Sequence, residues 1–94
     1  MPPVLINLNA EIICRKLADL GIWHETEWIP ADNLWVLFFK TYENKVEGCA
    51  FKVNGYFAPL LLVHSGTLNV EEGYISVDDV ISLIKNAYCT KGKK

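Results

Sequence analysis

Residues 34–55 read LWVLFFKTYENKVEGCAFKVNG, and this stretch decides the fold. Branched and aromatic residues dominate residues 34–42 and 46–53, which predicts two β-strands. Residues 43–45 are polar and turn the first strand back onto the second. Asn54-Gly55 is the strongest short hairpin signal in the chain, so residues 56–64 should form a further strand beside the second. The stretch therefore predicts an antiparallel meander.

The segment before this stretch adds one more strand. Residues 22–29 are rich in β-formers, and the turn composition of residues 30–33 connects them to the next strand. If this turn pairs Ile29 with Leu34, Trp28 faces Trp35 as a cross-strand aromatic pair. Pro59 cannot donate to a strand ladder, so the strand over residues 56–64 is expected at a sheet edge or with a bulge.

A helix is predicted on each side of the meander. Asn9 can cap a helix over residues 10–20, and Ser76 can cap a second helix over residues 77–89. Each helix has one apolar face that must be buried against the sheet. The predicted fold class is α+β: helix, four-strand antiparallel meander, helix, with both helices packed on one face of the sheet. The expected contacts are Leu17, Leu20, Ile81 and Ile84 against Leu37, Phe51 and Leu60.

Length and composition bound the organisation of the chain. Its 94 residues predict a single domain over residues 1–94, with an N-terminal extension at residues 1–8 and a flexible basic tail at residues 90–94. Hydrophobic residues make up 51% of the sequence, against the usual ~45–50%, which excludes a disordered chain. No apolar run is long enough for a membrane span, and no secretion signal is seen, so a cytoplasmic location is expected.

The cysteines agree with a reducing compartment. Cys14, Cys49 and Cys89 are odd in number, widely spaced and free of any CxxC motif. This pattern predicts buried or half-buried thiols and no intramolecular disulfide.

No catalytic, metal or cofactor site is predicted. Cys49 and His64 are the obvious thiol and imidazole to combine. A two-residue hairpin would place residue 60 opposite Cys49 and leave His64 about 13 Å away, beyond hydrogen-bond reach. His24 lacks the second histidine of a metal motif. The chain is therefore not expected to be an enzyme or to carry a cofactor.

The two faces of the predicted sheet differ from the usual pattern. One is a core face, expected to carry Trp35, Leu37, Phe39, Cys49, Phe51, Val53, Tyr56, Ala58, Leu60 and Leu62. An antiparallel sheet with one solvated face normally alternates apolar with polar residues, and here the second face keeps large apolar side chains. We expect that face to bind a partner through Val36, Phe38, Lys40, Ala50, Lys52, Phe57 and Leu61.

These features predict a small non-enzymatic protein-interaction domain, an adaptor, inhibitor or regulator that binds another protein chain, most simply a second copy of itself. An alternative is a single-stranded nucleic-acid-binding module, in which Phe38 and Phe57 stack bases beside Lys40 and Lys52. The net charge of −2 makes nucleic acid the weaker partner hypothesis. A third alternative is an enzyme whose site is completed at a dimer interface.

The start of the second predicted helix bears on duplex RNA. It reads Ser76-Val77-Asp78-Asp79. In its order of elements the chain resembles the double-stranded-RNA-binding domain, a family in which a lysine-rich start of this helix grips phosphate. The acidic residues here would repel phosphate, so no binding to duplex nucleic acid is expected.

Overall fold

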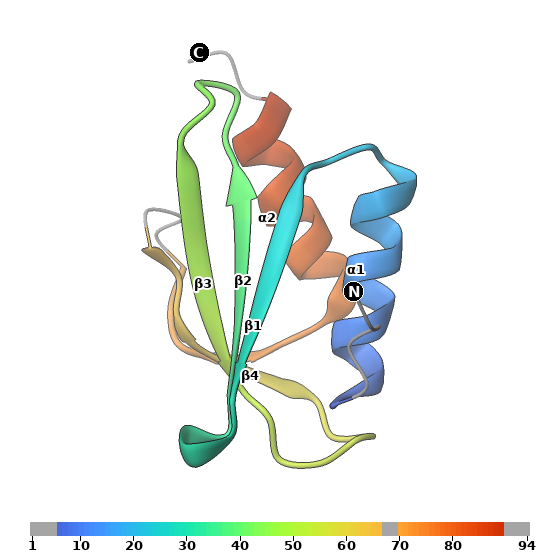
Figure 1. The fold of residues 1–94 in the computed structure, drawn as a ribbon, viewed down its shortest axis with the longest axis vertical. Coiled ribbons are helices and arrows are strands. Elements are labelled where there is room, and N and C mark those ends of the chain that lie inside the picture. The colour runs from blue at the N-terminus through green and yellow to red at the C-terminus, as the bar shows by residue number, and fades with distance from the viewer. Residues whose placement is uncertain (1–5, 67–69, 90–94) are drawn as a thin grey trace.

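The structure is a computed structural model that describes residues 6–66 and 70–89, without the side chain of Cys89. Its elements, in order, are α1 (Leu8–Asp19), β1 (His24–Ile29), a 3-10 turn η1 (Pro30–Asp32), β2 (Leu34–Lys40), β3 (Val46–Lys52), β4 (Leu60–His64), β5 (Gly73–Ile75) and α2 (Val77–Cys89) (Figure 1). All strands form one antiparallel sheet in the order β1-β2-β3-β4-β5. The α+β fold is confirmed, but the sheet has five strands instead of four.

The fifth strand, β5, is too short to be predicted from the sequence. β5 spans only Gly73–Ile75 and pairs with β4 through Leu60 and Ile75. A strand of three residues has no periodic pattern to recognise, so the sequence alone predicts a loop over residues 65–75. The sequence also suggests a short extended piece near residues 68–70, most of which lies outside the described residues.

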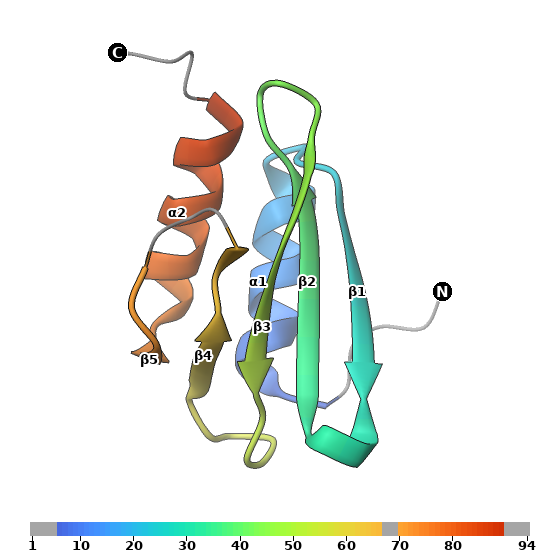
Figure 2. The same ribbon diagram turned by 90° about the vertical axis from the view of Figure 1, so that its left-hand side faces the viewer.

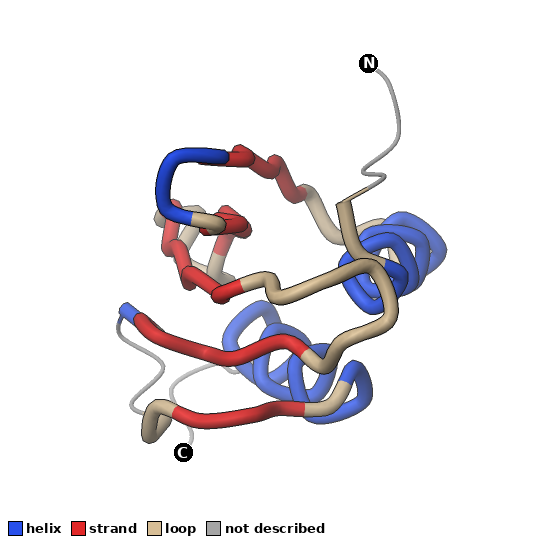
Figure 3. The backbone as a smooth tube through the Cα atoms, turned by 90° about the horizontal axis from the view of Figure 1, so that it is seen from below, coloured by secondary structure: helices blue, strands red, loops and turns tan. Residues whose placement is uncertain are grey.

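Both helices lie on the same side of the sheet and contact each other, which leaves the other face of β1, β2 and β3 open (Figure 2). Seen from below, β4 and β5 run at a steep angle to the other strands, so the sheet curves (Figure 3). The pairing of β3 with β4 shifts between Ala50 and Phe51, and such a bulge increases local twist. Neither of the two described helices has the length and hydropathy needed to cross a membrane.

The core lies between the helices and the sheet. Leu17 and Ile84 of the helices and Leu37, Phe51 and Leu60 of the strands are fully or almost fully buried there, as predicted. Leu20 is the exception: it is the C-cap of α1 and 47% exposed. The rest of the apolar cluster comprises Ala10, Ile13, Ile22, Trp35, Phe39, Cys49, Val53, Leu62, Val80 and Ile81.

The first helix starts earlier than predicted. Its N-cap is Asn7, whose Oδ1 accepts hydrogen bonds from the backbone N–H groups of Asn9 at 2.8 Å and Ala10 at 3.1 Å. Asn9 was therefore the wrong cap, because the sequence offers two asparagines and either suits the position. Asn7 and Leu8 belong to the fold and not to an extension, while residues 1–5 lie outside the described part.

The second helix follows the prediction. Val77–Cys89 is helical, and the N–H of Asp79 donates to Oγ of Ser76 at 3.1 Å. The expected tail at residues 90–94 lies outside the described residues. In the first hairpin, Trp28 is opposite Trp35, also as predicted, although β1 begins at His24 and not at residue 22.

The prediction of a two-residue hairpin at Asn54-Gly55 was wrong. β4 begins at Leu60, and residues 53–59 form a loop, so Phe51 pairs with Leu62. The carbonyl oxygen of Gly55 accepts hydrogen bonds from the side chain of Asn7 at 2.7 Å and from the N–H of Ala58 at 3.4 Å. These bonds hold the segment as a loop anchored to α1, in place of a tight two-residue turn.

Candidate interaction surface

The helix-free face is built from alternate residues of the strands. On β2 the inward residues are buried, so Val36, Phe38 and Lys40 point to the open side. Across the ladder, Val36 is opposite Ala50 and Phe38 is opposite Gly48. We call this set the open face; it comprises Glu25 and Glu27 of β1, Leu34, Val36, Phe38 and Lys40 of β2, Val46, Gly48, Ala50 and Lys52 of β3, Leu61 and His64 of β4, and Tyr74 of β5.

Six of the seven residues predicted to bind a partner lie on the open face, and Phe57 does not. Phe57 is in the loop before β4 and is 80% exposed, with its ring edge-on to Tyr56 at 5.0 Å between centroids. Tyr56 and Ala58, expected in the core, are in the same loop, where Tyr56 is exposed and Ala58 half-buried. The error for all three follows from the hairpin that did not form.

The rows of the open face differ from the predicted ones. A three-residue turn at residues 43–45 would pair Val36 with Lys52 and Phe38 with Ala50, whereas the observed partners are Ala50 and Gly48. The turn is longer than expected, because β2 ends at Lys40 and the N–H of Thr41 donates to the carbonyl of Lys45 at 2.9 Å. The register shift is even, so every β2 and β3 side chain keeps its predicted face.

The small residues of the open face are partly covered by the chain itself. A Cβ placed on Gly48 would lie 3.1 Å from Cδ1 and 3.2 Å from Cε1 of Phe38, so the Phe38 ring lies across this glycine. Ala50, in the next row, is only 7% exposed although it belongs to the open face. The centre of the face is thus a flat apolar patch of half-buried side chains, not a groove.

Charge is divided across the open face. Glu25 and Glu27 lie on β1, at one edge of the sheet, opposite Phe38 and Val36. Lys40 and Lys52 lie at opposite ends of the two central strands. The two carboxylates therefore lie along one edge of the apolar patch, and the two lysines lie at its two ends.

The residues that sequence reasoning missed are at the margins of the patch. Val46 and Tyr74 are both largely exposed; Val46 pairs with Lys40, and Tyr74 pairs with Leu61. Tyr74 could not be assigned because its strand is so short. Val46 was assigned to a strand, and its alternation with Gly48 and Ala50 was enough to place it on the open face.

Cys49 and His64 point to opposite faces of the sheet and do not form a reactive pair. His64 is opposite Ala50, next to Cys49 in the ladder, so its expected separation of four strand positions was wrong. Cys49 points into the core, where its Sγ is 3.9 Å from the carbonyl of Leu37, while His64 is exposed on the open face. Burial raises the pKa of Cys49 to about 12 and that of Cys14 to about 11, so both stay protonated thiols at neutral pH.

Two further observations concern chemistry. In residues 6–66 and 70–89, no cluster of histidine, cysteine and carboxylate side chains could hold a metal ion. Nδ1 of His24 lies 3.0 Å from the carbonyl of Ile22, a local contact at the start of β1.

No family model matches the chain, and no curated protein or solved structure is significantly similar to it.

Proposed function

We propose that this chain is a non-enzymatic protein-interaction domain that pairs with a second copy of itself through the open face and acts as an adaptor, inhibitor or regulator in the cytoplasm. The apolar patch around Val36, Phe38 and Ala50, on a sheet face that carries no helix, is the observation behind this proposal. Contiguous apolar surface on a small domain is typical of an interaction site. The reduced thiols Cys14 and Cys49 suit the cytoplasm.

The flatness of the patch favours a flat partner. Because the ring of Phe38 covers Gly48, the face has no deep slot for an inserted helix or peptide side chain. A second sheet face of the same shape can stack on it at about 10 Å, the usual spacing of packed sheets. Leu61 and Tyr74 extend the apolar contact toward β4 and β5.

The charges favour a second copy over an unrelated chain. Two-fold pairing requires that the patch complement itself. A two-fold axis along β2 would lay β1 of each copy over β3 of the other and bring Glu27 near the lysine of the facing strand, Lys52. The contact between Glu27 and Lys52 would then occur twice in the dimer, once for each copy, which sets the orientation.

The nucleic-acid alternative receives less support. Phe38 and Phe57 were expected to form a common stacking surface, but Phe57 is in a loop away from the sheet face and one edge of the Phe38 ring packs against Gly48. Stacking of successive bases needs aromatic faces free to receive them.

Sedimentation of the wild type and of Phe38→Glu tests the proposal. The wild type should sediment as a concentration-dependent dimer, and Phe38→Glu as a monomer with an unchanged circular dichroism spectrum, because a charge placed in the patch opposes its burial. Leu8→Glu is the matched control. It adds the same charge at an exposed apolar residue away from the open face, at the start of α1, and should leave the dimer intact. A monomeric wild type would refute the proposal, and an unfolded Phe38→Glu would show that the face is core.

A further inference from the structure

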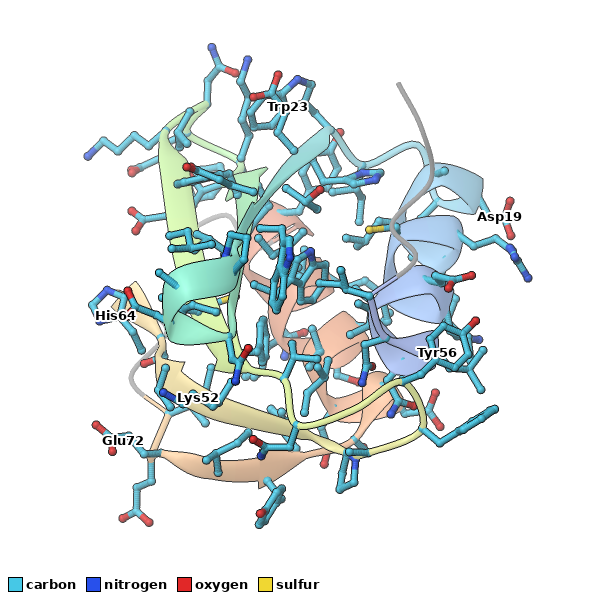
Figure 4. All side chains as sticks on the ribbon, turned by 60° about the horizontal axis from the view of Figure 1, so that its bottom comes forward. Asp19, Trp23, Lys52, Tyr56, His64 and Glu72 are labelled. Carbon is cyan, nitrogen blue, oxygen red and sulfur yellow. The ribbon has the colours of Figure 1, made fainter. Side chains whose placement is uncertain are left out.

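A second, separate feature is a cleft at the end of the molecule where three connections meet. The α1–β1 connection, the β2–β3 connection and the last turn of α2 border an open cleft of about 480 Å³. This volume lies within the roughly 300–1,000 Å³ of small-molecule sites. Trp23 marks this end in Figure 4, far from Tyr56 and Lys52. The cleft is lined by Gly21, Trp23, Lys40, Thr41, Tyr42, Asn44 and Tyr88.

The cleft gathers aromatic side chains that the core leaves free. Trp23, Tyr42 and Tyr88 come from three different segments, and each is between 38% and 47% exposed. The N–H of Tyr42 donates to the carbonyl of Ala87 at 3.2 Å, which ties the β2–β3 connection to the end of α2. Aromatic faces held around one cavity can enclose a flat ring.

The charge of the lining is positive. Nζ of Lys40 lies 5.0 Å from the ring centroid of Trp23, so the ammonium group is held at the cleft by a cation–π contact. The described lining residues include no carboxylate. Glu43 accepts a hydrogen bond from the hydroxyl of Tyr42 at 3.4 Å, and its carboxylate lies 3.5 Å from Nζ of Lys45, an exposed ion pair that balances its charge. The ammonium group of Lys40 would repel a cationic ligand in the cleft, whereas it would form an ion pair with an anionic one.

We propose that this cleft binds a planar ring that carries an anionic group, of the size of a nucleoside monophosphate. The ring stacks among Trp23, Tyr42 and Tyr88, and the anion pairs with Lys40. Both a free nucleotide and the 5′ end of a single strand offer this chemistry. Lys40 belongs to both the open face and the cleft, whereas Trp23, Tyr42 and Tyr88 lie outside the open face. The inference does not require self-association, and a change at Tyr88 tests the cleft without altering the proposed dimer face.

Titrations followed by ¹⁵N-resolved NMR test the cleft directly. Adenosine monophosphate should shift the backbone amides of Gly21, residues 40–44 and Tyr88 at millimolar concentration or below. Adenosine, which lacks the charge, and ribose 5-phosphate, which lacks the ring, should each bind at least tenfold more weakly. A 5′-phosphorylated oligoadenylate identifies the source: affinity equal to that of the monophosphate indicates a free nucleotide, and tighter binding indicates a strand end.

Matched variants separate the site from general surface effects. Tyr88→Leu should weaken binding of the monophosphate about tenfold through lost stacking, and Lys40→Gln about tenfold through the lost ion pair. Tyr56→Leu removes a tyrosine of similar exposure at the other end of the molecule, and Lys16→Gln removes an exposed lysine of α1; both should bind as the wild type does. Absent shifts with every probe, equal affinity for the two fragments and the whole nucleotide, or equal loss in the controls would overturn the proposal.

Discussion

The side-chain amide of Asn7 donates a hydrogen bond to the carbonyl oxygen of Gly55 at 2.7 Å, across 48 positions of the chain. The same amide group donates to the carbonyl of Ala58 at 3.0 Å, while Oδ1 caps α1. Asn7 is completely buried, whereas the loop that its amide group holds is partly exposed. One side chain thus fixes both the start of the first helix and the loop that enters β4.

Replacement of Asn7 by alanine should therefore cost more than an ordinary cap. Loss of the cap alone costs ~0.5–2 kcal/mol, and each of the two hydrogen bonds lost to the loop contributes ~0.5–1.5 kcal/mol more. We expect Asn7→Ala to lower the free energy of unfolding by about 2–4 kcal/mol in urea titrations. Asn9→Ala, which removes only a 3.1 Å bond to Ala58, is the control and should cost less than half as much. Equal losses would show that Asn7 acts as a cap and no more.

Two leucines of α1 test the placement of the core. Leu17 is fully buried, whereas Leu20 is largely exposed one turn later. Leu17→Ala should lower the free energy of unfolding by ~2–5 kcal/mol, because it opens a cavity between helix and sheet. Leu20→Ala should change it by less than about 0.5 kcal/mol, as at other surface sites. Chemical denaturation of both variants compares them; a large loss at Leu20 would contradict the observed end of α1.

The buried thiols predict a loss of stability in alkali. The pKa of Cys49 is raised from 9.0 to about 12 and that of Cys14 to about 11 in the folded chain, so the folded state holds these protons while the unfolded state releases them. Stability is then complete below pH 9 and falls as the pH rises toward 11–12, with the Cys49 thiol contributing roughly 1 kcal/mol of loss by pH 10 and the half-buried Cys14 less.

Urea midpoints measured between pH 8 and 10 check this effect. Cys49→Ala should have a flatter pH profile than the wild type, whatever its stability at pH 8. In the folded protein, iodoacetamide should modify Cys49 more slowly than the half-buried Cys14. Rapid alkylation of Cys49 at pH 8 would mean that the core opens there.

Charge reversal probes the orientation of the proposed dimer. Lys52→Glu or Glu27→Lys alone should weaken self-association about two- to fivefold, since exposed pairs contribute ~0.2–1 kcal/mol. The double variant should recover most of the affinity, because the attractive pairs are restored with their signs exchanged. Sedimentation at low and high salt measures both effects. Lys85→Glu, at an exposed position of α2, is the control. If the loss of binding free energy in the double variant equals the sum of the two single losses, the two side chains do not meet.

The faces of the sheet could be predicted although its exact register could not. Apolar alternation fixed which side of Leu37 and Phe51 is buried, and errors of two or four positions at the turns preserve that alternation. The loop around Gly55 depends on Asn7, which is remote in sequence, and no local rule contains that bond. Local turn chemistry was overruled there by a tertiary contact.

The candidate sites divide in the same way. Strand alternation was enough to group Val36, Phe38 and Ala50, because they lie on neighbouring strands. The cleft brings together Trp23, Tyr42 and Tyr88, which are far apart in the chain and share no periodic pattern. Only the three-dimensional arrangement of the connections reveals it.

The two outer strands of the sheet have a consequence for colloidal behaviour. β1 and β5 end the strand order, and each has one side without a neighbour in the described sheet. Acidic side chains occupy alternate positions of β1, and β5 has only three residues. Repulsion between carboxylates disfavours the stacking of β1 against another β1, and β5 is too short to template a foreign strand. A chain so rich in strand-forming residues is thereby protected against growth into fibrils.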